Sequence, residues 1–339
     1  MAANSNLPRT KTLLISLGMA VSAVFAYLAI QHVRFNDVWS GLRECSYWWL
    51  LPAFAALVVA NVLRGVRWQY LFAPETRPPY RHVLSAMLLG QFFNNILPGR
   101  AGEAARIVAI NQSCGTSRVE AAGTVVSERV WDVLSLLALL FVAVPWLPNV
   151  TWLRTAAILL IVVVAGTVIT LSVLAKWSER SLLFVLRPLT LLPFVSSQRT
   201  ATAAANLVHG LVGLRRVRLV FVAFLLSVVS WLVLDLSAWF VLQSSHLDLP
   251  FGAALLTYVA VGFGMTLPAS PANIGVFEAA TIVALRAYHV PDSQALSYAL
   301  ILHTLNFFPY IAAGLLILQG HAISARRTRL VSKQYASGD

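Results

Sequence analysis

The feature that most constrains this chain is a pair of breaks in its apolar runs, one in each half. Residues 94–106 read Asn-Asn-Ile-Leu-Pro-Gly-Arg-Ala-Gly-Glu-Ala-Ala-Arg, and residues 265–279 repeat Leu-Pro, then a glycine, a glutamate and an alanine. In a bilayer, backbone groups freed by proline and glycine must be covered by protein or line a water-filled cavity. A charge near the bilayer centre costs about 2.5–3.5 kcal/mol. Two charged breaks therefore predict an internal polar site.

The composition indicates that this polar site belongs to a polytopic membrane protein. Of the 339 residues, 58% are hydrophobic and 11% are charged, whereas about a quarter of a soluble domain is charged. The net charge of +12 is explained by Lys and Arg in cytoplasmic loops, which also attract anionic lipids. We therefore expect anionic membrane lipids and a lipid-linked substrate as partners, and no nucleic acid. A homo-oligomer is also compatible with this composition.

Long apolar runs predict an all-α fold of about six to eight transmembrane helices plus two re-entrant helical hairpins. The expected crossings are 13–30, 48–66, 119–144, 152–175, 219–242 and 295–318, and the expected hairpins span 82–112 and 251–287. Each hairpin limb has roughly 15 residues and could also be a thin full span, which would give up to ten crossings. The first run could instead be a signal peptide, but more membrane segments follow it.

Charge and order of the segments predict one transmembrane domain over residues 1–339 that contains an inverted repeat. The basic loop 176–218 and the basic tail 321–339 put both termini in the cytoplasm. Halves at about 12–150 and 151–320 then run in opposite directions through the membrane. Paired, interrupted hydrophobic segments in such halves are typical of the binding site of a secondary transporter.

The charges of the first break predict an anion site. Half-helix ends direct free N–H groups and a positive dipole into the protein, and arginine binds phosphate bidentately. We expect Arg100, Arg106 and Arg129 to hold a lipid phosphate, while Glu103 and Glu278 bind headgroup amines or hydroxyls or carry protons. In the simpler alternative, Arg100 and Arg106 are headgroup anchors and Glu103 pairs with Arg106.

Further candidates are polar residues within apolar runs. Glu128 and Asp132 lie four residues apart and share a helix face, as either a ligand site or a structural ion network. Glu278 is a carboxylate that burial would make titratable, whereas Asp235 lies inside an apolar run and could simply neutralise a basic group, and His303 could be a core histidine. The expected substrate-binding residues are Arg100, Glu103, Arg106, Glu128, Arg129, Asp132, Asn273 and Glu278, and the expected proton relay is Glu278, Asp235 and His303.

Motifs of metal, nucleotide and acyl-transfer chemistry are missing from the sequence. It contains no Cys/His cluster at zinc spacing, P-loop, dinucleotide fingerprint or nucleophile elbow. We therefore expect no cofactor, no metal and no catalytic residue. Cys45 and Cys114 flank segments expected on opposite membrane faces, so no disulfide is expected between them.

Four motifs together resemble the transmembrane region of lysylphosphatidylglycerol synthases of the MprF type and of related stand-alone proteins. They are Arg-Gly-Val-Arg-Trp (64–68), Pro-Gly-Arg-Ala-Gly-Glu-Ala-Ala-Arg (98–106), Glu-Arg-Val-Trp-Asp (128–132) and Ser-Pro-Ala-Asn-Ile-Gly-Val-Phe-Glu (270–278). The resemblance covers nearly the whole chain. It implies a lipid flippase of a bacterial inner membrane, whose cargo is a phospholipid, an aminoacyl-lipid, a hopanoid or a polyprenyl-phosphate-linked saccharide.

The sequence departs from this family pattern in two places. A short basic tail leads to Asp339, so we expect no aminoacyl-transferring domain, and lysylphosphatidylglycerol is not implied as the cargo. Residues 272–275 read Ala-Asn-Ile-Gly where the family pattern is richer in glycine. Two other functions stay open: a membrane-embedded transferase with Glu103 or Glu278 as general base, and an accessory subunit of a glycolipid or envelope assembly pathway.

Overall fold

The computed structural model describes residues 9–31, 33–97, 100–143, 217–265 and 270–336, with single positions between 155 and 166. The regular structure of these residues is helical, without a strand. The elements are α1 (Arg9–Ile30), α2 (Phe35–Arg43), η1 (Tyr47–Trp49), α3 (Leu50–Leu71), α4 (Tyr80–Ile96), α5 (Ala101–Cys114), α6 (Arg118–Ala143), α10 (Val217–Ser244), α11 (Phe251–Gly264), η5 (Pro271–Asn273), α12 (Val276–Arg286) and α13 (Asp292–Ala336). Most of the expected crossing 152–175 and nearly all of the basic loop 176–218 lie outside the described residues.

Several helices have the length and composition of membrane spans. Among the described residues, Tyr47–Leu71, Phe221–Ser244 and Asp292–Gly320 are long and apolar enough to cross a bilayer. The pair α1 and α2, bent by 84°, adds a fourth if it counts as one broken span. The expected helical membrane protein is confirmed, while the count of six to eight crossings and the inverted repeat stay predictions.

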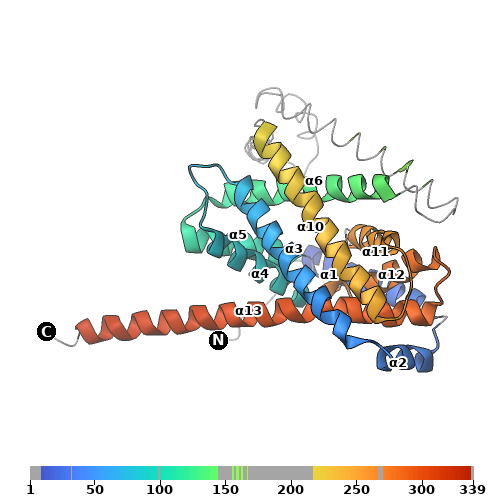
Figure 1. Ribbon diagram of the computed structural model, residues 1–339. Helices are drawn as coiled ribbons and strands as arrows, with labels where there is room; N and C mark the ends of the chain where they lie inside the picture. Colours follow the sequence, from blue (N-terminus) through green and yellow to red (C-terminus); the bar gives the residue numbers. More distant parts are fainter. Residues whose placement is uncertain are drawn as a thin grey trace.

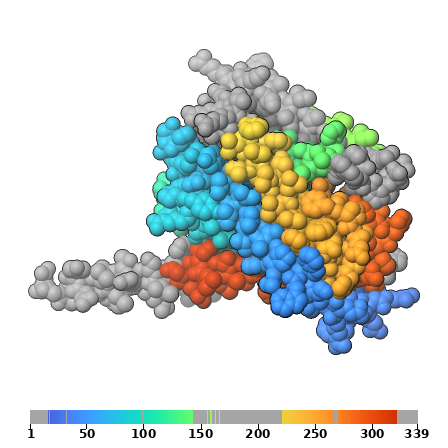
Figure 2. Space-filling view, viewed as in Figure 1, coloured from blue at the N-terminus to red at the C-terminus, as the bar shows by residue number. Residues whose placement is uncertain are grey.

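The centre of the molecule is the contact between α3 and α10, the most extensive one between the described helices. Figure 2 shows the blue α3 and the yellow α10 lying against each other across one face. Small residues meet at this contact, where Oγ of Ser237 on α10 donates to the carbonyl of Ala53 on α3 at 2.7 Å and both residues are fully buried. Small side chains let helix backbones approach closely in a membrane. The long helix α13 passes across the bundle and extends beyond it towards the C-terminus (Figure 1).

Both broken segments fold into pairs of packed helices. In the first pair, α4 and α5 approach so closely that Gly102 lies against the backbone of Gly90. The N–H of Gly102 donates to Oδ1 of Asn94 at 2.9 Å, which fixes the start of α5. In the second pair, α11 packs on α12, with Gly264 against Val276. The expected limbs are therefore helices, and their re-entry from one membrane face stays a prediction.

The two breaks meet in space although they are far apart in sequence. The 3-10 turn η5 of the second break packs against α4 of the first. Nη2 of Arg100, the residue before α5, donates to the carbonyl of Met265, the residue after α11. Both breaks contain non-glycine residues in the left-handed region, with φ of 56° at Arg100, 57° at Ala272 and 59° at Asn273. Such backbone persists where the surrounding structure holds it.

We expect Gly102→Ala to destabilise the protein, because the added methyl would overlap the carbonyl oxygen of Gly90 and the side chain of Asn94. Forcing extra volume into a packed contact costs about 1–3 kcal/mol. The measurement is the thermal unfolding midpoint in detergent. Gly320→Ala is the matched control, since no atom lies within 4 Å of its added methyl. An unchanged midpoint for Gly102→Ala would contradict the close packing of α4 on α5.

Candidate functional site

Arg67 of α3 is the centre of a buried ion network. Its side chain is fully buried, and its Nη1 donates to Oδ1 of Asp132 and to Oγ of Ser227, each at 2.6 Å. Its Nη2 donates to Oε1 of Glu128 at 3.0 Å. A buried charge is tolerated when it is paired and hydrogen-bonded. One guanidinium therefore connects α3, α6 and α10.

Arg106 connects the first break to this centre. It is 5% exposed, and its Nη1 donates to Oε2 of Glu128 at 2.8 Å. Its guanidinium lies over the ring of Trp68, 4.9 Å from the centroid, while Nε1 of Trp68 donates to Thr124 at 3.0 Å. Its Nε and Nη2 are buried without a hydrogen-bond partner among the described residues. These two groups are donors that a ligand could use.

Two other arginines form an open end of the network. Arg129 Nη2 lies 2.9 Å from Oε1 of Glu103 and its Nη1 lies 3.6 Å from Asp132. Arg100 Nη1 lies 4.0 Å from the same oxygen of Glu103. The side chains of Arg100 and Arg129 are 46% and 45% exposed. Two guanidinium groups that can be reached from outside therefore converge on a single carboxylate.

A third part of the network lies along α10. Nε1 of Trp231 donates to Asp132 at 3.1 Å, and the guanidinium of Arg64 lies 4.5 Å from the centroid of the Trp231 ring. Asp235, one turn further on, is fully buried, and neither carboxylate oxygen has a hydrogen-bond partner among the described residues. Arg64 is the basic residue whose positive charge interacts electrostatically with the Asp235 carboxyl group.

The network carries more positive than negative charge. Its five arginines are Arg64, Arg67, Arg100, Arg106 and Arg129, and its four carboxylates are Glu103, Glu128, Asp132 and Asp235. With all groups ionised, one positive charge is left without a matching carboxylate. The arrangement is suited to an additional anion.

A separate pair of titratable groups lies at the second break. Nδ1 of His303 on α13 lies 2.5 Å from Oε1 of Glu278, and its Nε2 lies 3.1 Å from the carbonyl oxygen of Ala272. The other oxygen of Glu278 accepts the N–H of Gly275 at 2.6 Å. The imidazole stacks on Phe277 with centroids 4.4 Å apart. Glu278 thus connects α12, α13 and the turn before α12.

The structure divides the residues expected from sequence between these two places. It brings together Arg100, Glu103, Arg106, Glu128, Arg129 and Asp132 in the ion network, with Asp235 beside Arg64. Glu278 and His303 lie at the second break, where Asn273 is the last residue of η5. The alternative pairing of Glu103 with Arg106 is wrong, because Glu103 pairs with Arg129 while Arg106 pairs with Glu128. Burial also excludes Arg106 as a headgroup anchor.

Arg67, the residue at the centre of the network, is not among the site residues predicted from the sequence. Arg64 and Arg67 follow a long apolar run, and this position suggests side chains that extend to the membrane interface. Arg67 instead turns inward to two carboxylates more than 60 positions away. The available signal was the motif 64–68 itself, in which two arginines at i, i+3 share a helix face.

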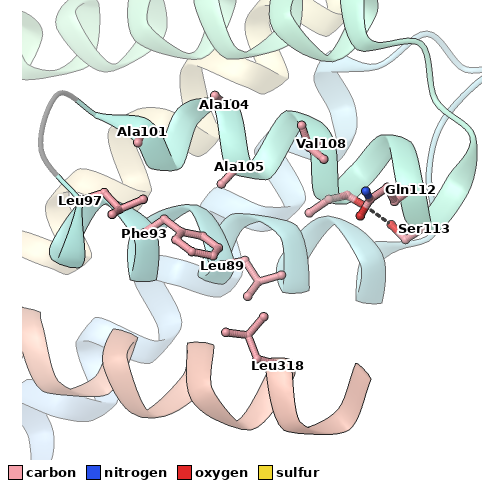
Figure 3. Close-up of a pocket in the computed structure, with 11 residues that line it drawn as sticks. Leu89, Phe93, Leu97, Ala101, Ala104, Ala105, Val108, Gln112, Ser113 and Leu318 are labelled. Carbon is pink, nitrogen blue, oxygen red and sulfur yellow. Dashed lines mark hydrogen bonds between the residues drawn. The ribbon is translucent and has the colours of Figure 1, made fainter. Parts of the chain in front are cut away.

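An apolar groove of about 660 Å³ lies beside the network, between α4, α5 and α13. Figure 3 shows Leu89 of α4 and Leu318 of α13 pointing towards each other across it. Its lining residues are Leu89, Phe93, Leu97, Ala101, Ala104, Ala105, Val108, Ala109, Gln112, Ser113 and Leu318. Ala101 and Ala105 are the chain neighbours of Arg100 and Arg106. Helix α5 therefore separates the arginine network from an apolar surface.

Comparison with known proteins gives a family match and two distant relatives. A family model described as the lysylphosphatidylglycerol synthase TM region matches residues 15–314. A UPF0104 membrane protein of Methanothermobacter thermautotrophicus is 25% identical over 282 residues, which cover 78% of this chain and 82% of the relative. A UPF0104 membrane protein of Methanocaldococcus jannaschii is 23% identical over 235 residues, which cover 66% of this chain and 91% of the relative.

We expect Arg67→Ala to lower the free energy of unfolding by about 3–5 kcal/mol, because Glu128 and Asp132 would be left buried without their shared cation. Unfolding in mixed detergent micelles measures this loss. Arg286→Ala is the matched control, since Arg286 pairs with Asp292 at 2.7 Å but is 47% exposed. An exposed pair contributes about 0–1 kcal/mol. Equal losses in the two variants would contradict the central role of Arg67.

Proposed function

The chain belongs to the lysylphosphatidylglycerol synthase transmembrane region family, and we propose that it is a translocase that moves a phosphate-bearing lipid between membrane leaflets. The cargo class comprises phospholipids, aminoacyl-lipids and polyprenyl-phosphate-linked saccharides. The observation that carries the proposal is the buried arginine network, which has an excess of positive charge. Two of its arginines are exposed, Arg100 at the first break and Arg129 on α6.

The open end of the network is suited to a lipid phosphate. Arg100 and Arg129 approach the same oxygen of Glu103, so one carboxylate is shared by two cations and leaves positive charge for an anion. Guanidinium groups bind phosphate oxygens bidentately. Helix α5 begins directly after Arg100, and the dipole of a helix favours an anion at its N-terminus. The phosphate would bind here, with the unpartnered donors of Arg106 behind it.

The groove beside the network is suited to the hydrocarbon part of the same lipid. It lies on the opposite side of α5, where Ala101, Ala105 and Val108 form part of its lining. A lipid bound across α5 would have its headgroup among the arginines and one acyl or isoprenoid chain in the groove. Because such a chain is already in hydrocarbon within the bilayer, van der Waals packing rather than the hydrophobic effect would hold it in the groove.

The proposed place of action is the inner membrane of a bacterial cell, with both termini in the cytoplasm. The basic loop 176–218 and the basic tail support this orientation. The partners would then be the anionic lipids of that membrane and the lipid cargo itself.

In vesicles that contain fluorescent phosphatidylglycerol, we expect the purified protein to exchange the lipid between leaflets faster than protein-free vesicles. Arg129→Gln should lower the rate about tenfold or more, because a hydrogen bond to a charged group is worth about 1.5–3 kcal/mol. Chemical quenching of the outer-leaflet fluorophore measures the rate. Arg43→Gln is the matched control, since Arg43 is an exposed arginine at the end of α2. Exchange equal to empty vesicles for every headgroup tested would refute the proposal.

Filling the groove should slow exchange without removing any charge. In Val108→Trp the indole would occupy the space proposed for the lipid chain, and we expect a lower exchange rate for long-chain lipids. Val58→Trp is the matched control, because Val58 is similarly exposed, at 45% against 37% for Val108, but lies on α3 away from the groove. The rate for a short-chain fluorescent lipid should be less affected by Val108→Trp. If both variants exchange lipids like the wild type, the groove does not hold the chain.

A further inference from the structure

We propose that lipid movement is coupled to a proton, and that the Glu278–His303 pair at the second break is the site that binds it. The coupling rests on the proposed translocation, while the proton site itself rests on the contacts of the pair. Both side chains are largely buried, with 10% of Glu278 and 13% of His303 exposed. The arginine network does not use either of them.

The contacts of the imidazole determine how many protons the pair holds. The carbonyl oxygen of Ala272 can only accept, so Nε2 of His303 donates to it at 3.1 Å. A neutral imidazole that donates from Nε2 has a lone pair on Nδ1, and an ionised carboxylate offers only lone pairs. The contact of 2.5 Å between Nδ1 and Oε1 of Glu278 can therefore be a hydrogen bond at the same time only when a second proton lies between these two atoms. With both hydrogen bonds formed, the pair holds one proton more than a neutral histidine and a carboxylate would.

This proton maintains the conformation of the second break. Without it, the neutral imidazole has a single N–H, which would lie at Nδ1 next to the carboxylate, and Nε2 would present a lone pair to the carbonyl oxygen of Ala272. His303 would then no longer be held where it binds the carbonyl of Ala272, a residue in the left-handed region with φ of 57°. The left-handed backbone of Ala272 and Asn273 costs about 1–3 kcal/mol per residue and depends on its surroundings. In this proposal the break is closed, with His303 bound to the carbonyl of Ala272, when the pair is protonated. It is open, without that hydrogen bond, when the pair is deprotonated.

The helices packed around the pair carry further polar groups. Helix α12 packs against α1, α11 and α13. From α13 come His303 and, one turn on, Asn306, whose Nδ2 donates to the hydroxyl of Tyr258 on α11 at 3.1 Å. Tyr258 in turn interacts electrostatically with Asp235 and Arg64. From α1, the uncharged Ser22 accepts the N–H of Ser270 at 2.7 Å.

The two breaks are also in direct contact, so opening of the second affects the first. Arg100, one of the arginines proposed to bind phosphate, donates to the carbonyl of Met265 next to the second break. The turn η5, which contains Ala272, also packs against α4 of the first break, so a change at the Glu278–His303 pair that moves η5 would reach the helix next to the headgroup site. One proton would bind to the pair from one side of the membrane and leave to the other for each lipid moved.

The leaflet distribution of a lipid at steady state tests this coupling. Vesicles with fluorescent phosphatidylglycerol receive a gradient of about one pH unit, with the membrane potential clamped at zero by a potassium ionophore. A passive exchanger gives an even distribution. One coupled proton per lipid shifts the distribution by up to about tenfold, since one pH unit is a tenfold change in proton activity. The shift should reverse when the gradient is reversed.

The variant Glu278→Gln separates proton binding from structure. A glutamine amide can donate to Nδ1 of His303 and accept the N–H of Gly275, so the hydrogen bonds of the break are kept while the releasable proton is lost. We expect an even distribution with this variant under either gradient. Glu75→Gln, the same change at an exposed site, should behave like the wild type. A gradient-driven asymmetry retained in Glu278→Gln would overturn the proposal.

Two outcomes distinguish failure of the coupling from failure of the translocation. If the wild type exchanges lipid but the distribution stays even under both gradients, the coupling is wrong and the translocase proposal stands. If the wild type exchanges no lipid, the translocase proposal fails, and infrared difference spectra at different pH values then test the proton site alone. A carboxyl band that is absent in Glu278→Gln must change with pH. A pH-independent band would overturn the proton site.

Discussion

The packing of helices α3, α5, α6 and α10 depends on pairing the positive charge of one buried guanidinium with carboxylates. Arg67 is fully buried and binds both carboxylates of α6, while Glu128 also binds Arg106 of α5. If one of these helices shifted alone, a charge would be left buried without its partner, at a cost of several kcal/mol. Apolar residues of similar volume often stabilise a protein interior at least as much as a buried ion pair does. Stability alone therefore does not explain the network, whereas the proposed binding of a charged ligand would.

Each break in the membrane helices is completed by a side chain from elsewhere in the fold. Arg100 of the first break donates to a backbone carbonyl beside the second, and His303 of α13 donates to Ala272 within the second. Both donors satisfy backbone oxygens that the helices no longer use, as a low-dielectric environment requires. Neither break could adopt its conformation alone. The two breaks therefore depend structurally on contacts with other parts of the fold.

The sequence predicts the elements of this fold better than their pairing. Hydropathy and Pro-Gly breaks are local signals, so the expected limbs 82–97 and 251–267 correspond closely to α4 and α11. The spacing of Glu128 and Asp132 also placed both on one face, where both bind Arg67. Their partner could not be identified in the same way, because it depends on how α3 and α6 cross. Likewise, Glu278 has no basic neighbour in sequence, and its partner lies on another helix, 25 positions further on.

The distribution of polar groups supports one pathway through an otherwise apolar core. The buried cluster that includes α3, α10, α11 and α13 consists of hydrophobic residues, yet Arg64, Asp235 and Tyr258 lie close enough together within the same helices to interact electrostatically. Polar side chains in a membrane interior are costly and are retained where they serve transport. Asp235 has no hydrogen bond among the described residues, and Arg106 uses only part of its donors. Groups that are incompletely satisfied in one arrangement can be satisfied in another, and alternation between two leaflets requires such groups.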